Sequence, residues 1–306
     1  MRILITGGAG FIGSNLALTL QEKLPSARIY VLDNFSSGHF RNLTGFEGEV
    51  ITGDVRDREL WSFLRSRFAF DVIFHEAALT DTTVEDQRLM METNADSLRY
   101  LLEAALDWNA KVIYASSAGV YGNTPPPMRE DRGLEPENIY GFSKLMMDRI
   151  AQDYMERFPE LRIVGLRYFN VYGPRESYKG RSASMIYQLA LKILHGQKPK
   201  LFKWGEQKRD FVYVKDVVKA NLLALEKDVS GVFNIGTGRA RSFNEIMEIL
   251  NRELGTDYEP DYFDCPYDFY QEHTEADISR ARDQLGYEPT YSLEEGIREY
   301  LSYLRS

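Results

Sequence analysis

Three glycines near the amino terminus place the strongest constraint on how this chain folds. Gly7, Gly10 and Gly13 follow the apolar run Ile3–Ile5 with the spacing G-x-x-G-x-x-G, and an amphipathic stretch, Ser14–Lys23, comes next. The first glycine permits a tight turn, the second lets the backbone approach a pyrophosphate, and the third lets a helix pack close to the strand. Free N–H groups at the start of that helix favour phosphate. The pattern predicts a strand, a glycine turn and a helix that together bind a dinucleotide.

Short apolar runs alternate with helical patterns through the first half of the chain. This alternation is typical of a parallel sheet with helices on both faces. We therefore predict an α/β fold: a Rossmann-type doubly wound parallel sheet with a smaller mixed α/β C-terminal substrate lobe. Residues 1–169 are expected to form the dinucleotide-binding domain, segments near 211–237 to return to it, and residues 170–306 to form mainly the substrate-binding lobe. The expected strands are Ile29–Leu32, Val50–Thr52, Val72–Phe74, Val112–Ala115 and Ile163–Leu166, and the expected helices between them are Ser14–Lys23, Arg58–Arg67, Glu85–Trp108 and Ile139–Phe158.

Composition narrows the classes of partner. The chain has 306 residues, of which 43% are hydrophobic, and a formal net charge of −9. A large core is therefore expected, and the acidic balance argues against nucleic-acid binding. No apolar run approaches the roughly 18 residues that span a bilayer, so no membrane association is expected. Cys265 is the only cysteine, and the strand pattern begins too early for a signal peptide. We expect a cytoplasmic protein without a metal site.

Two acidic residues stand where strands of the predicted sheet end. Asp33 closes the second strand, 20 residues beyond Gly13, where a carboxylate can accept hydrogen bonds from the adenosine ribose. Asp54 ends the third strand and could meet the adenine amino group. Each could instead be a simple cap or turn residue.

Ser117, Tyr140 and Lys144 are the candidate catalytic residues. Tyr140 and Lys144 are spaced i, i+4 on a predicted helix, so the phenol and the ammonium share one face. A tyrosine ordinarily loses its proton near pH 10, and a nearby positive charge lowers that pKa. The phenolate could then take a proton from a substrate alcohol as hydride leaves for a nicotinamide. Ser117 follows the fifth strand and could hold the same substrate oxygen.

These motifs resemble the extended short-chain dehydrogenase/reductases, the superfamily of nucleotide-sugar epimerases and dehydratases. The resemblance rests on the loop T-G-G-x-G-F-I-G, the segment S-S-A-x-V-Y-G from Ser116 to Gly122, and the pair Y-x-x-x-K. Sugar dehydratases of this superfamily carry an acidic pair just after the serine position. Here Ala118 and Gly119 occupy those places, which disfavours dehydration.

The second half of the chain is most similar to the ADP-L-glycero-D-manno-heptose 6-epimerases. The similar blocks are Arg167–Glu176 with Lys179 and Gly180, Pro199–Phe202, Lys208–Val214, Phe233–Ala240 and Tyr270-Gln271, together with His75–Ala78 in the first half. The resemblance implies inversion at C6 of a nucleotide-linked heptose. Because that carbon bears no acidic proton, inversion requires transient oxidation to a ketone and return of the hydride to the other face. In the family, residues that match Tyr140 and Lys179 are the two acid/base groups.

The resemblance also implies binding roles. Residues expected at the cofactor are Phe11, Ile12, Asp33, Asn34, Glu76, Ala77, Ala78, Asn94, Lys144 and Val171. Residues expected at the substrate are Asn170, Lys179, Phe202, Arg209 and Tyr270, with Gln188 in the place of a family histidine. Arg41 and Arg58 match basic residues that accompany a 2′-phosphate, so the cofactor is expected to be NADP, ahead of NAD. A homo-oligomer is also implied.

Some features favour other functions. The loop Asn34–Gly38 is closer to UDP-hexose 4-epimerases, and Phe269 stands where the heptose epimerases often have arginine. A UDP-hexose 4-epimerase is therefore the alternative enzyme, and a dinucleotide-sensing protein without catalysis is a remote one. The sequence leaves open whether residues 123–138 form a lid.

Overall fold

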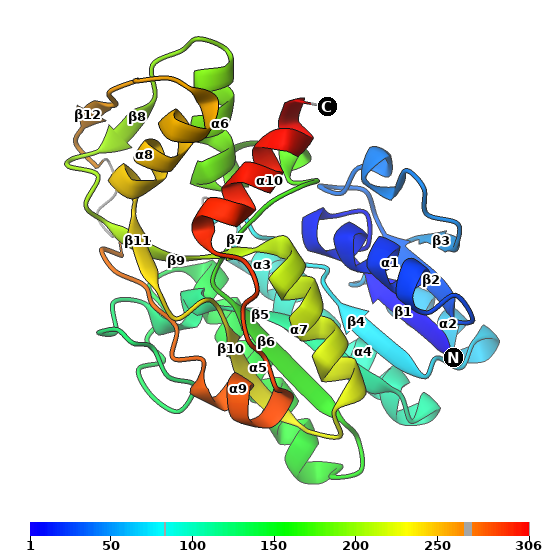
Figure 1. Ribbon diagram of the computed structural model, residues 1–306. Coiled ribbons are helices and arrows are strands. Elements are labelled where there is room, and N and C mark those ends of the chain that lie inside the picture. Colours follow the sequence, from blue (N-terminus) through cyan, green and yellow to red (C-terminus); the bar gives the residue numbers. More distant parts are fainter. Residues whose placement is uncertain (83, 266–270, 306) are drawn as a thin grey trace.

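A parallel sheet of seven strands forms the centre of the computed structural model, which describes the whole chain except residues 83, 266–270 and 306 (Figure 1). The strand order is β10-β6-β5-β4-β1-β2-β3, and every neighbouring pair is parallel. The strands are β1 (Arg2–Thr6), β2 (Arg28–Asp33), β3 (Glu49–Thr52), β4 (Val72–His75), β5 (Lys111–Ser117), β6 (Ile163–Tyr168) and β10 (Gly231–Ile235).

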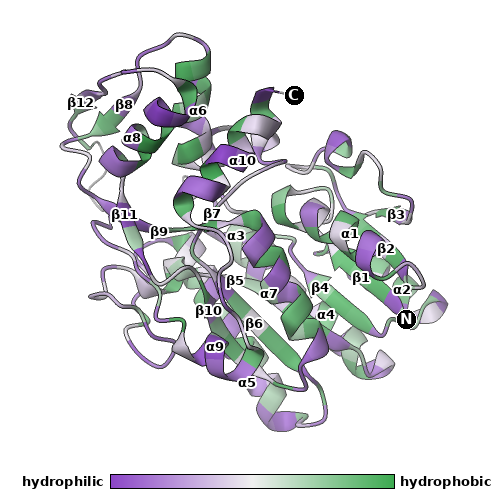
Figure 2. Ribbon diagram, in the orientation of Figure 1, coloured by the Kyte–Doolittle hydropathy of each residue, from purple (hydrophilic) through white to green (hydrophobic). Residues whose placement is uncertain are grey.

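Helices cover both faces of this sheet. In β1, Ile3 and Ile5 point into one apolar cluster and Leu4 into the other, as the alternation of side chains along a strand requires. The first cluster is completed by α1 (Phe11–Lys23), α7 (Val214–Glu226) and α9 (Ser279–Leu285). The second is completed by α2 (Arg58–Arg67), α4 (Ser97–Trp108) and α5 (Ile139–Arg157). Figure 2 shows the hydrophobic strands between these helices. The predicted doubly wound α/β fold is confirmed.

One expected helix is interrupted. The sequence predicts one helix over Glu85–Trp108, but α3 (Gln87–Met91) and α4 are joined by a π-helical turn, η2 (Glu92–Asp96). A π turn inserts an extra residue into the helix and turns a side chain out of the regular face. Here it buries Asn94, whose side chain bonds the backbone N–H of Leu79 at 2.8 Å and the hydroxyl of Ser143 at 2.9 Å.

A smaller lobe follows β6. It contains two small sheets, with strand orders β11-β9-β7 and β12-β8, and an apolar cluster of its own. The division at residue 169 stays a prediction: β10 pairs with β6 in the main sheet, whereas β9 pairs with β7 in the lobe. The lobe's elements are β7 (Asn170–Tyr172), α6 (Met185–Leu194), β8 (Lys200–Phe202), β9 (Lys208–Tyr213), β11 (Ala240–Ser242), α8 (Phe243–Leu254), β12 (Asp261–Phe263) and α10 (Leu293–Arg305).

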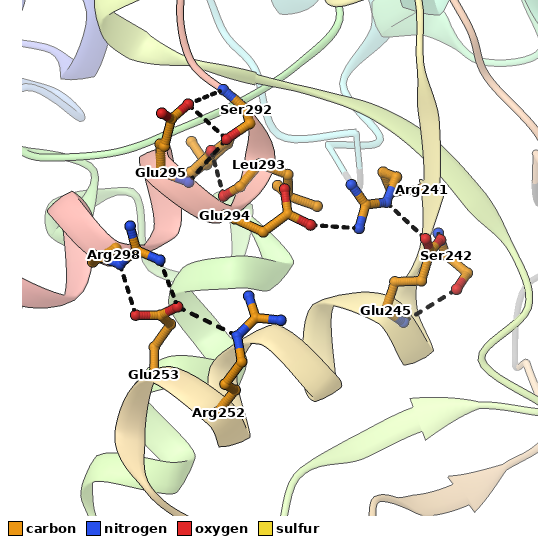
Figure 3. Close-up of polar contacts among 11 residues, drawn as sticks. Arg241, Ser242, Glu245, Arg252, Glu253, Ser292, Leu293, Glu294, Glu295 and Arg298 are labelled. Carbon is orange, nitrogen blue, oxygen red and sulfur yellow. Dashed lines mark hydrogen bonds and ion pairs between the residues drawn. The ribbon is translucent and has the colours of Figure 1, made fainter.

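Ion pairs join the C-terminal helix α10 to β11 and to α8, as Figure 3 shows. Arg241 contacts Glu294 at 2.8 Å, and Arg298 contacts Glu253 at 2.9 Å. Single exposed ion pairs stabilise little, but several together restrict how two helices can slide. The network therefore fixes the position of α10 against the rest of the lobe. No helix in the described part of the chain has the length and apolarity needed to cross a membrane.

A buried ion pair joins helix α5 to strand β6. Asp148 on α5 contacts Arg167 on β6 at 2.9 Å, with side-chain exposures of 6% and 3%, and also accepts from the hydroxyl of Tyr114. Asp148→Ala removes the carboxylate that pairs with the buried guanidinium of Arg167, so the free energy of unfolding should fall by about 3–5 kcal/mol in urea denaturation. The matched control on the same helix is Asp153→Ala, which breaks the exposed pair with Arg157 and should change stability little. Equal losses of unfolding free energy in the two variants would contradict a stabilising role for the buried pair.

Candidate functional site

The glycine turn between β1 and α1 brings backbone close to backbone. Gly7 has φ +67°, and a Cβ placed there would lie 2.6 Å from Cα of Ala77. A Cβ on Gly13 would lie 2.3 Å from the carbonyl oxygen of Gly7. The turn is therefore closed to larger residues, and the first turn of α1 begins directly beyond the end of β1.

A cavity of about 420 Å³ lies beyond the carboxyl ends of β1, β4, β5 and β6. Its size is within the range of small-molecule and cofactor sites. The sequence-predicted residues that line it are Gly7, Gly10, Phe11, Ile12, Gly13, Asp33, Asn34, Glu76, Ala77, Ala78, Ser117, Tyr140, Lys144, Asn170, Val171 and Lys179. Residues from both halves of the chain therefore meet at one cavity. Residues 123–138, the suggested lid, do not line it.

Asp33 closes the wall of the cavity at the end of β2. Its carboxylate accepts hydrogen bonds from the N–H groups of Ala9 at 2.9 Å and Phe35 at 2.8 Å, while burial raises its pKa. Asp54 lies outside the lining. A hydrogen bond from Arg56 is the main reason that the pKa of Asp54 falls to about 2, and Asn34 also donates to it.

Neither arginine expected at a 2′-phosphate lines the cavity. The guanidinium of Arg41 lies 5.9 Å from the ring centroid of Phe40, and that of Arg58 lies 4.7 Å from the ring centroid of Tyr100. Both side chains are therefore directed to aromatic rings on the protein itself.

Tyr140 and Ser117 are hydrogen-bonded to each other at the cavity wall. The sequence predicts that the ammonium of Lys144 lowers the pKa of Tyr140. Burial is the larger effect in this structure and raises that pKa, and the bond from Ser117 opposes the rise. The Nζ atom of Lys144 lies 5.9 Å from the Tyr140 ring centroid and donates to the carbonyl of Ala115 at 2.8 Å. Burial lowers the pKa of Lys144 to about 8, and Glu76 and Asp148 oppose this shift.

Some buried polar atoms at or near this wall make no hydrogen bond within the described part of the protein. Ser116 Oγ and His75 Nε2 have no hydrogen-bond partner among the described residues, and Ser116 lines the cavity. Glu76 accepts from the hydroxyl of Tyr168 at 2.9 Å, and burial raises its pKa to about 7. Buried polar groups are normally paired, so Ser116 Oγ, with the glycine turn and Asp33, fits a dinucleotide, whereas His75 does not line the cavity.

Lys179 enters the cavity from the smaller lobe. It belongs to a short 3-10 segment, η4 (Ser177–Ser182), and its Nζ lies 5.4 Å from the ring centroid of Phe11 on the first turn of α1. Burial lowers the pKa of Lys179, opposed by the charge of Glu176. A second basic group therefore shares the cavity with Tyr140.

Other predicted site residues lie outside the lining. Asn94 is buried and holds the backbone of Leu79, which does line the cavity. Gln188 on α6 donates to the carbonyl oxygen of Ala183 at 2.8 Å. Phe202 on β8 packs edge-to-face with Phe263. Arg209 on β9 lies over Phe243, a lining residue. Tyr270 lies outside the described residues.

Sequence reasoning missed several lining residues. Ser116 was adjacent to a predicted catalytic serine and could have been found by that proximity. Ser36, Ser37 and Gly38 belong to the loop Asn34–Gly38, and Tyr168 to the block Arg167–Glu176, so the resemblance could have found them. Ser182, Ser184 and Phe243 also line the cavity and carry no distinctive motif. In the described part of the chain, no group of His, Cys, Asp or Glu side chains could hold a metal ion.

An aromatic stack joins the two sides of the cavity. The rings of His39 and Tyr178 lie parallel, with centroids 3.7 Å apart and an interplanar angle of 2°. Their sequence neighbours Gly38 and Lys179 both line the cavity. The stack therefore connects the loop after Asp33 to the segment that carries Lys179.

Comparison with known proteins identifies the family. The model of the NAD dependent epimerase/dehydratase family matches residues 3–236. The chain belongs to this family. The predicted superfamily and the predicted enzyme class, an isomerase that epimerises nucleotide sugars, are both confirmed.

Solved structures of epimerases match the whole chain. It is 49% identical to the ADP-L-glycero-D-manno-heptose-6-epimerase of Helicobacter pylori, with a TM-score of 0.93 and coverage of 100% of this chain and 96% of that one. It is 34% identical to the UDP-glucose 4-epimerase of Thermotoga maritima, with a TM-score of 0.93 and coverage of 100% and 99%. It is 30% identical to the UDP-glucose 4-epimerase of Thermus thermophilus in complex with NAD, with a TM-score of 0.88 and coverage of 100% and 99%.

The stack between His39 and Tyr178 should slow release of a bound dinucleotide. Tyr178→Ala removes the stack and should raise the rate at which reduced dinucleotide leaves by about three- to tenfold, because an aromatic pair stabilises by about 0.5–1.5 kcal/mol. Tyr178→Phe keeps the ring and is the matched control. Release can be followed by the fluorescence of the reduced nicotinamide after dilution. Identical rates in the two variants and the unaltered protein would rule out a role for the stack.

Proposed function

We propose that this protein inverts C6 of an ADP-linked glycero-manno-heptose through a ketone. The observation that carries the proposal is the position of Lys179, which lines the same cavity as Tyr140 and Lys144 although it belongs to the other lobe. A reaction that passes through a planar ketone needs acid/base groups that can serve both orientations of the carbonyl. The family and the 49% identity to a heptose epimerase support the assignment.

The cofactor supplies chemistry that side chains lack. A bound nicotinamide dinucleotide provides reversible acceptance of a hydride from carbon, together with positive charge beside the phenol when it is oxidised. The glycine turn and the N-terminus of α1 would hold its pyrophosphate, and Asp33 its ribose hydroxyls. Lys144 and Ser116 would contact its nicotinamide end.

Tyr140 and Lys179 are the proposed acid/base pair. In the oxidation, the phenolate of Tyr140 accepts the proton of the C6 hydroxyl, and Ser117 holds the oxygen by a hydrogen bond. In the return step, a proton goes back to the carbonyl oxygen in its second orientation, and the ammonium of Lys179 is its donor. Both side chains are partly buried and line the cavity, so each can reach a bound substrate.

We propose NAD as the cofactor, in place of the sequence-based preference for NADP. Asp33 lines the cavity, and a carboxylate there repels a 2′-phosphate. Arg41 and Arg58, which could neutralise that phosphate, are exposed, and neither lines the cavity. The cytoplasmic location and the homo-oligomeric state stay predictions.

A UDP-hexose 4-epimerase is the second candidate. It is favoured by the loop Asn34–Gly38, part of which lines the cavity, and by the 34% identity to the Thermotoga maritima enzyme. A sensor without catalysis is disfavoured because Ser117, Tyr140 and Lys144 all line one cavity.

The function is tested by incubating the protein with each C6 epimer of the ADP-linked heptose and following the C6 proton by NMR. We expect interconversion that falls at least about a hundredfold in Tyr140→Phe, because general acid/base groups typically contribute 10²–10⁴-fold. Lys179→Ala should also lose most of its turnover while still binding the dinucleotide. Interconversion of UDP-glucose and UDP-galactose, without turnover of the heptose, would replace this assignment by the second candidate.

Cofactor choice is tested by measuring the affinity of the dinucleotide-free protein for NAD and NADP by calorimetry. NAD should bind at least about tenfold more tightly, because juxtaposed like charges cost several kcal/mol. Asp33→Asn removes the negative charge and should bring the affinities for NAD and NADP closer together. Tighter binding of NADP by the unaltered protein would contradict the proposal.

A further inference from the structure

One buried carboxylate joins the two ends of the loop that carries Lys179. The loop spans residues 173–184, between β7 and α6. Glu176 Oε1 accepts from the N–H of Gly173 at 3.1 Å and from the hydroxyl of Ser184 at 2.8 Å, and Oε2 accepts from the N–H of Ser184 at 2.6 Å. Because Gly173 begins the loop and Ser184 ends it, a single side chain closes the loop around Lys179.

The C-terminal helix supplies a further donor to this carboxylate. Tyr300 on α10 is hydrogen-bonded to Glu176, and burial raises the pKa of Tyr300, so its hydroxyl keeps the proton that it donates. The ion pairs drawn in Figure 3 join α10, the helix that carries Tyr300, to β11 and α8. The loop is thus fixed to an element more than a hundred residues away in the sequence.

Glu176 is 0% exposed and forms no ion pair within the described part of the chain. Burial raises its pKa, and the bonds from Ser184 and Gly173 and the charge of Lys179 oppose that rise. The converse holds for Lys179, where burial lowers the pKa and Glu176 opposes it. The other titratable groups that face Glu176 are Tyr300 on α10 and Tyr187 on α6.

We propose that Glu176 is a positioning residue for the epimerase reaction: it closes the 173–184 loop and keeps the side chain of Lys179 charged at the cavity wall. The proposal rests on the acid/base role proposed for Lys179. A carboxylate suits this place because all of its partners at the loop ends are donors. A glutamine amide has one oxygen and one NH₂ group, so at least one loop end would lose its acceptor.

The experiment compares the unaltered protein with Glu176→Gln, first without any substrate. Acylation of the Lys179 amine by a small anhydride is measured by mass spectrometry at a series of pH values, and amide hydrogen exchange is measured over residues 177–183. In Glu176→Gln, the Lys179 amine should lose its proton at lower pH and label at least about threefold faster at neutral pH. Exchange in the loop should also accelerate. Unchanged labelling and exchange would overturn the proposal.

Ser184→Ala tests closure of the loop separately from the negative charge of Glu176. It removes the hydroxyl bond to Glu176 and the cap bond that Ser184 accepts from the N–H of Tyr187, but it leaves the carboxylate, so loop exchange should accelerate while the pH dependence of Lys179 labelling stays the same. Tyr300→Phe, which removes the donor from α10, should also accelerate loop exchange. If Glu176→Gln does not fold, these two variants carry the test, and unaltered exchange in both would overturn the proposal.

The role of Glu176 can be tested separately from the identity of the substrate. Labelling and exchange need no sugar nucleotide, so they test Glu176 even if the heptose is not a substrate. With a turning-over substrate, Glu176→Gln should lower kcat more than it changes KM, and the limb of the pH profile that belongs to Lys179 should move to lower pH. A rise in KM with unchanged kcat would contradict a role in placing the acid/base group.

Discussion

The contact between the glycine turn and the first turn of α1 is the constraint on which the site depends. A Cβ on Gly13 would lie 2.3 Å from the carbonyl oxygen of Gly7, so only glycine lets the helix begin this close to β1. The same helix then anchors the loop that carries the second basic group. Phe11 lies under Lys179, and Asn15 donates to the carbonyl oxygen of Pro174 at 2.9 Å. The turn that suits a pyrophosphate therefore also places a residue from the other lobe.

Burial controls the protonation of the groups that this packing brings together. It moves the pKa of Lys144 down to about 8 and that of Glu76 up to about 7, so both come near the neutral range. It also raises the pKa of Tyr140, which argues that the protein alone does not produce the phenolate. Positive charge from an oxidised nicotinamide is the contribution that would offset this. On this account the tyrosine becomes a base when the oxidised cofactor is beside it.

The alternation of strands and helices, the glycine turn and the lining residues Ser117, Tyr140 and Lys144 could be predicted, because each follows from local patterns in the sequence. The π turn around Asn94 could not, because an inserted residue leaves the apolar pattern of a helix nearly intact. The contact between His39 and Tyr178 and the closure of the loop by Glu176 depend on distant segments meeting, which spacing along the chain does not encode. The roles of Arg41 and Arg58 stay predictions, since neither arginine lines the cavity.

The central claim is that hydride is removed from carbon and returned to the same carbon while the cofactor stays bound. Conversion of the ADP-linked heptose in D₂O, with the product examined by mass spectrometry and proton NMR, tests it most directly. The account predicts that the inverted C6 carries no deuterium, because the returning hydride comes from the substrate and never exchanges with solvent. Deuterium at C6 of the product would show that a proton from solvent reaches that carbon, and this would contradict inversion by transient oxidation.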